Sequence, residues 1–70
     1  MKASEKIKEI ENKLREYIAL LKDLEYIDSI YENLDWADIY KPHHIGMELS
    51  QVIYDVRNKI EEIESKLERI

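Results

Sequence analysis

Apolar residues recur in alternating steps of three and four along two long stretches of this sequence. Such a heptad repeat places one apolar side chain per helical turn on the same side of a helix. In the first stretch the repeat consists of Ile7, Ile10, Leu14, Tyr17, Leu21 and Leu24. In the second stretch it consists of Leu49, Ile53, Val56, Ile60, Ile63, Leu67 and Ile70. The pattern predicts two long amphipathic helices, each with an apolar line that faces a neighbour.

The positions of glycine and proline limit where the chain changes direction. The 70 residues include one proline, Pro42, and one glycine, Gly46, and these two residue types most often interrupt helices. Ser4 is a suitable N-cap for the first helix. The expected elements are a long helix over about 4–34, a turn over about 35–46 and a second helix over about 47–70.

Two long helices joined by a short turn lie antiparallel when their apolar lines meet. We therefore expect an all-α fold in which residues 1–70 form a single helical-hairpin domain. A chain this short is at the lower limit of what one hydrophobic core stabilises. The sequence has no cysteine, which excludes disulfides and thiolate metal sites. Association with another subunit is the remaining common means of stabilising so small a fold.

The apolar stripe of the first helix is wider than contact with one antiparallel neighbour requires. Its extra side chains would form an exposed apolar patch, which usually marks an interaction surface. Because two-fold dimers are the commonest oligomers, we expect two hairpins to pair into a four-helix bundle; the alternative is docking of a different protein. The expected self-association residues are Ile18, Leu20, Leu24, Ile27 and Ile30.

Charge is distributed unevenly along the chain, whose net charge is −5. Residues 1–22 hold six bases and four acids, a sum of +2, and residues 56–70 hold four of each. Residues 23–55 hold eight acids and one base, Lys41, a sum of −7. The turn end of the hairpin is therefore expected to be acidic. The excess of acids argues against direct nucleic-acid binding, because phosphate contacts need an excess of Lys and Arg.

Most aromatic residues fall in the same acidic region. Tyr31 fits the apolar stripe and is expected in the core, whereas Tyr and Trp in a turn are common anchors of protein interfaces. Acidic side chains around such anchors attract a basic partner and speed its encounter. The expected partner-binding residues are Trp36, Tyr40, Asp35, Asp38, Glu32 and Asp28.

The sequence contains no recognisable arrangement for catalysis. It has no Gly-x-Ser-x-Gly elbow and no Gly-rich phosphate loop. His43 and His44 are adjacent, and neighbouring residues on a helix point in different directions, so they make a poor chelating pair. We expect no metal, no cofactor and no enzymatic activity.

The sequence also bears on the cellular location. No apolar run approaches the roughly 20 residues of a membrane span, and the charged first residues do not resemble a signal peptide. We therefore expect no membrane association and a cytoplasmic location.

These features together predict a non-catalytic protein-interaction module, a small adaptor or inhibitor, that is homodimeric and binds a basic partner surface through its acidic aromatic turn end. Two alternatives stay open. The first is an inhibitor whose carboxylates mimic nucleic-acid phosphates. The second is a purely structural dimerisation module. A metal-dependent enzyme is a third and weaker hypothesis.

Overall fold

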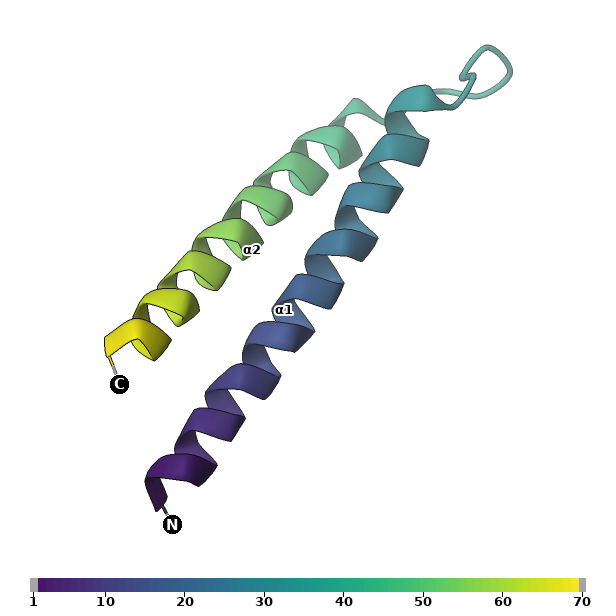
Figure 1. Ribbon diagram of the computed structural model, residues 1–70. Helices are drawn as coiled ribbons and strands as arrows, with labels where there is room; N and C mark the ends of the chain where they lie inside the picture. The colour runs from purple at the N-terminus through teal and green to yellow at the C-terminus, as the bar shows by residue number, and fades with distance from the viewer. Residues whose placement is uncertain (1, 70) are drawn as a thin grey trace.

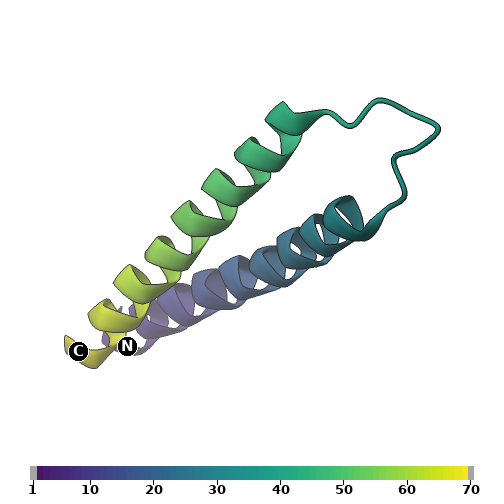
Figure 2. The ribbon, with the colours of Figure 1, turned by 90° about the horizontal axis from the view of Figure 1, so that it is seen from above.

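The computed structural model describes residues 2–69 and the side chains from Ser4 to Arg69. Helix α1 spans Lys2–Asn33 and helix α2 spans His43–Arg69. The two helices pack against each other in opposite directions, with both termini at the end away from the loop (Figure 1 and Figure 2). The described residues contain no strand, so the expected all-α hairpin is confirmed. Ile70, the last position of the expected repeat, lies outside the described residues.

The core follows the two heptad lines but is deeper on α2. Four residues at heptad positions of α2 are buried, and Ile63 is the most buried of them, with 4% of its surface exposed. On α1 the heptad residues from Ile7 to Leu24 are half-buried, and Tyr31, seven residues after Leu24, is buried. No side chain from Ser4 to Arg69 is completely buried. One line of contact therefore shields α2 better than it shields α1.

The turn is shorter than the sequence indicates. We expected it over about 35–46, but α2 begins at His43, so the connection covers residues 34–42. The expectation was wrong because Gly46 is not a turn residue. No residue in the described range has a positive φ angle. The carbonyl of Pro42 accepts a bond from the Ile45 amide at 3.0 Å, which places Pro42 directly before the first turn of α2.

Gly46 has a packing role inside α2. A Cβ atom at this position would lie 2.8 Å from Cε1 of Tyr31, a distance that real Cβ contacts do not reach. Gly46 also precedes Leu49 by three residues, so it extends the heptad line of α2 back toward the turn. The smallest residue therefore stands where a tyrosine of the α1 line packs against α2.

Ion pairs on the hairpin surface connect the helices and stabilise α2 locally. Arg57 of α2 lies 2.8 Å from Glu25 of α1. Within α2, a carboxylate oxygen of Glu62 lies 3.2 Å from the ammonium nitrogen of Lys59 and 3.7 Å from that of Lys66. The hydrogen bond and positive charge of Lys59 hold the pKa of Glu62 below its ordinary value. Neither described helix carries an apolar stretch long enough to cross a membrane.

Candidate interaction surfaces at the turn end

Tyr31 connects the last turn of α1 to the first turn of α2. Its ring is buried against Gly46, and its hydroxyl donates a hydrogen bond of 2.7 Å to the carbonyl of Pro42. Both contacts cross from one helix to the segment that begins the other. Tyr31 therefore determines how closely the two helices approach at the turn end. The sequence predicted this residue in the core, and its burial confirms that prediction.

Trp36 closes the end of α1. Its indole Nε1 donates to the carbonyl of Tyr31 at 2.9 Å, which satisfies one of the carbonyls that a helix leaves free at its C-terminus. The indole edge also meets the Tyr31 ring, with centroids 5.4 Å apart and planes at 60°. Trp36 is half-buried. The sequence predicted Trp36 as a partner contact, whereas the contacts that the structure gives it lie within the hairpin.

Lys41 occupies a third position around the same ring. Its ammonium nitrogen lies 5.0 Å from the centroid of Tyr31 and 3.9 Å from a carboxylate oxygen of Glu32. A cation at this distance from an aromatic face is attracted by the ring electrons. The one base of the acidic region therefore faces inward, toward Tyr31 and Glu32.

The loop presents its acids and one tyrosine to solvent. Oδ1 of Asp35 accepts a hydrogen bond from the Ala37 amide at 3.0 Å, and the Ile39 amide donates to the Trp36 carbonyl at 3.4 Å. These bonds form a tight turn. Asp38 is exposed, and Tyr40 is 84% exposed.

The six predicted partner-binding residues do not all share one surface. Asp35, Asp38 and Tyr40 lie exposed on the loop, and Glu32 is exposed on the last turn of α1. Asp28 is half-buried at a heptad position, in a hollow that Ser29, Ile53 and Arg57 also line.

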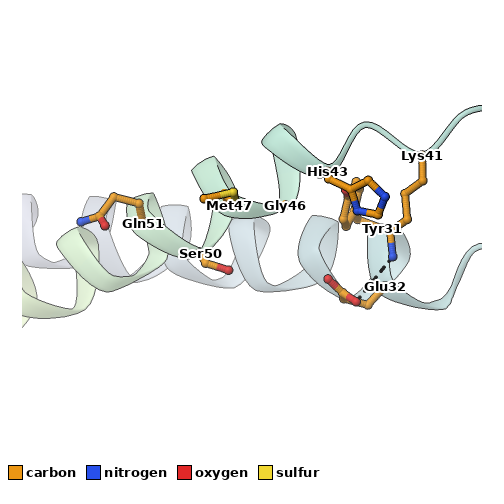
Figure 3. Close-up of a pocket in the computed structure, with 8 residues that line it drawn as sticks. All are labelled: Tyr31, Glu32, Lys41, His43, Gly46, Met47, Ser50 and Gln51. Carbon is orange, nitrogen blue, oxygen red and sulfur yellow. Dashed lines mark ion pairs between the residues drawn. The ribbon is translucent and has the colours of Figure 1, made fainter.

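An open hollow of about 720 Å³ lies beside Tyr31 (Figure 3). Figure 3 shows Lys41 reaching across it toward Glu32. Ser50 and His43 also line it, but they are seven residues apart on α2, about 10 Å along the helix axis. That spacing separates the hydroxyl from the imidazole, so these two residues are not arranged as a nucleophile and its base. The residues lining the hollow are Tyr31, Glu32, Lys41, His43, Gly46, Met47, Ser50 and Gln51.

Metal ligands do not gather elsewhere in the described part of the chain. Among residues 2–69, no three His, Asp or Glu side chains lie close enough together to hold a metal ion. His44 and Glu48, four residues apart, both lie in α2, but two ligands are fewer than a closed metal site requires.

The line of contact between the helices divides the hairpin into two faces. Glu25 and Arg57 form an ion pair across it, so both lie on one face, which we call the ion-pair face. Residues seven apart on a helix point within about 20° of each other. Ile18, seven before Glu25, and Ser50, seven before Arg57, therefore also belong to the ion-pair face.

The opposite face is apolar near the turn. At about 100° per residue, Ile27 points about 180° away from Ile18, and Val52 lies about 140° from Arg57, beyond the buried line of α2. Each of the side chains on this face is 39–49% exposed. We call this surface the apolar face, and it consists of Leu20, Ile27, Ile30, Leu34, Ile45 and Val52.

The five predicted self-association residues are thus divided among three places. Leu20, Ile27 and Ile30 lie on the apolar face, Leu24 lies in the contact line, and Ile18 lies on the ion-pair face. The sequence analysis did not include the other three members of the apolar face. Their signal was present, because Leu34 follows Ile27 by seven residues and Val52 follows Ile45 by seven.

Comparison with known proteins finds no matching family model, no similar curated protein and no similar solved structure.

Proposed function

We propose that this chain is a non-catalytic protein-interaction module, acting as a small adaptor or inhibitor, whose acidic turn end binds the basic surface of a partner protein. The observation that carries the proposal is the sum of −7 over residues 23–55, the segment that contains the loop and the adjoining parts of both helices. Asp35, Asp38 and Tyr40 stand exposed there. An exposed tyrosine on a loop that also carries exposed carboxylates suits an interface in which an aromatic anchor is accompanied by charges that attract the partner.

The internal contacts of the turn end support this role. Trp36 and Tyr31 hold the two ends of the loop through their hydrogen bonds to the Tyr31 and Pro42 carbonyls. A loop that is held in place before binding loses less conformational freedom when a partner arrives. Lys41 faces Tyr31 and Glu32, so the outward charge of the loop itself is negative.

The proposal includes pairing of two hairpins into a four-helix bundle. The half-exposed side chains of the apolar face support the pairing, since exposed apolar patches mark interaction sites. We place this homodimer in the cytoplasm, because a chain without cysteine suits a reducing compartment.

The test compares proteins retained from an extract of the source cells by immobilised wild type and by two variants of equal charge. The tip variant carries Asp35→Asn and Asp38→Asn, which removes two charges, while the side-chain amide introduced in place of the Asp35 carboxylate keeps an oxygen to accept from the Ala37 amide. The control carries Glu61→Gln and Glu64→Gln, two exposed acids in the far half of α2. We expect a protein retained by wild type and control, lost with the tip variant and released by salt.

Two outcomes would point elsewhere. If the tip variant retains the same proteins as wild type, the acidic end is not the binding surface and the chain is better described as a structural dimerisation module. If added DNA or RNA displaces the retained protein, the carboxylates act as a mimic of nucleic acid.

A further inference from the structure

The apolar face occupies a limited part of the hairpin. It runs from Leu20 to Leu34, fourteen residues or about 21 Å along α1, within a hairpin 58 Å long. Gly46 packs on Tyr31, so in an antiparallel pair Ile45 stands about level with Glu32 and Val52 about level with Glu25. All six side chains therefore lie within the half of the hairpin nearest the turn, and the centre of the face is at Ile27.

The hairpin exposes more surface than a compact chain of its mass. Its accessible surface is 5879 Å², whereas a folded monomer of 8.5 kDa is expected to expose about 4,700 Å². The excess is about 1,200 Å². Its radius of gyration is 16.5 Å, against about 11 Å for a compact globule of this length. A standard protein interface removes about 800 Å² from each partner, so a second copy would remove much of the excess.

The charge distribution excludes a parallel pair. If the two turn ends met, the exposed Asp35 and Asp38 of both loops would lie side by side, and like charges in contact oppose association. An antiparallel pair separates the two loops, because they then lie on opposite sides of the two-fold axis. The two-fold axis then runs across the hairpins and not along them.

The far half of the same face excludes full overlap. Glu9 and Glu16 precede Ile27 by eighteen and eleven residues, so they point within about 20° of its direction. With Lys13 and Lys66 they line a hollow on the half of the hairpin that carries the termini. Full overlap of antiparallel hairpins would press Ile27 of one copy against these charges of the other, and burying charges without partners is costly.

We propose that a second copy of this chain covers the apolar face in a staggered antiparallel arrangement, with the two-fold axis passing close to Ile27. Each apolar face lies on the other, Leu20 of one copy approaches Leu34 of the other, and the charged halves project outward at both ends. Ile18 stays outside the interface. The inference rests on the pairing proposed above and is independent of the acidic end and its partner.

Single cysteines test this arrangement, because the chain has none of its own. A disulfide forms only when two Cα atoms come within about 7 Å. Under mild oxidation we expect Ile27→Cys to form covalent dimers with itself. Leu20→Cys and Leu34→Cys are expected to form no covalent dimer alone and to cross-link to each other when mixed. Ile18→Cys, at an equally apolar position on the ion-pair face, is the control and is expected to form no covalent dimer.

Each other pattern overturns the proposal in a recognisable way. Self-cross-linking of Leu34→Cys would show that the turn ends meet, and self-cross-linking of Leu20→Cys without the mixed pair would show full overlap. Sedimentation of the unmodified chain gives the independent check. A mass near twice 8.5 kDa is expected, and a monomer at every concentration would overturn both the stagger and the pairing, while leaving the binding test of the acidic end unaffected.

Discussion

At the scale of single residues, the turn end depends on the packing of a large side chain, Tyr31, against Gly46, which has no side chain. Tyr31 is buried because Gly46 leaves room for its ring. Glycine inside a helix is destabilising by about 1 kcal/mol relative to alanine, so the sequence accepts a local cost at Gly46. That cost is offset by the close packing of Tyr31 and by its hydrogen bond to Pro42.

Gly46→Ala is therefore expected to destabilise the hairpin although alanine favours helix. The added methyl group would lie 2.8 Å from the Tyr31 ring, and overpacking of this kind costs about 1–3 kcal/mol. Urea unfolding followed by circular dichroism measures the effect. Ser50→Ala, at an exposed position of the same helix, is the control and is expected to be neutral or stabilising. An alanine variant at 46 as stable as wild type would mean that the ring moves aside without loss.

Tyr31→Phe isolates the hydrogen bond from the ring. The Pro42 carbonyl keeps its bond from the Ile45 amide, so the variant loses one hydrogen bond and leaves no unpaired acceptor. The expected loss in unfolding free energy is about 0.5–1.5 kcal/mol. Tyr40→Phe, at an 84% exposed tyrosine, should change stability by much less. Equal effects of the two substitutions would contradict a structural role for the Tyr31 hydroxyl.

At the scale of elements, the two helices differ in how they are stabilised. Helix α2 is buried along one narrow line and carries Glu62 between Lys59 and Lys66 on its exposed side. Helix α1 has a wider apolar stripe, which α2 covers only in part. As a result α2 contributes two exposed side chains to the apolar face, Ile45 and Val52, whereas α1 contributes three, Leu20, Ile27 and Ile30.

The ion pairs of Glu62 predict a pH dependence of α2. Lys59 holds the pKa of Glu62 in the folded chain below its ordinary value of 4.5. The stabilisation is therefore fully present above pH 4.5 and is lost as the pH falls through the lower folded-state value. Glu62→Gln should reduce the fall in thermal midpoint between pH 5 and lower values, whereas Glu61→Gln, an exposed neighbour, should reduce it less. Identical acid profiles for the two variants would contradict the assignment.

At the scale of the whole molecule, the free energy available from covering the apolar face is large compared with the stability of a small domain. Burying one Leu or Ile completely stabilises by ~1.5–3 kcal/mol, so covering the exposed half of six such side chains is worth roughly 4–9 kcal/mol per copy. A small domain is stable by only ~5–15 kcal/mol in total. Pairing would thus decide whether so thin a hairpin persists.

Ile27→Asp is expected to convert the proposed dimer to monomer and to lower the thermal midpoint. In a dimer the midpoint rises with protein concentration, because association stabilises only the folded chain. That dependence should disappear in Ile27→Asp and persist in Ile18→Asp, which adds the same charge on the opposite face. Sedimentation and thermal unfolding over a hundredfold concentration range measure both effects. A concentration-dependent midpoint in Ile27→Asp would place the interface elsewhere.

The sequence by itself determined the two helices, their antiparallel pairing and the acidic turn end. Heptad spacing and charge can be read along the chain, and the regular geometry of a helix places residues of a given spacing on the same side. The same logic assigned Tyr31 to the core. It failed at Gly46, because glycine usually indicates a turn. Here the glycine makes room for the side chain of Tyr31, which lies fifteen positions earlier in the chain.

Only the tertiary structure decided which flank of α1 shares a face with which flank of α2. The heptad lines of Leu20, Ile27 and Leu34 and of Ile45 and Val52 were both present in the sequence, but each helix alone has two equivalent flanks. The ion pair of Glu25 with Arg57 assigns one flank of each helix to a common face and leaves the apolar flanks together on the other. This relation depends on the relative direction and rotation of two packed helices, and the spacing within one helix does not contain it.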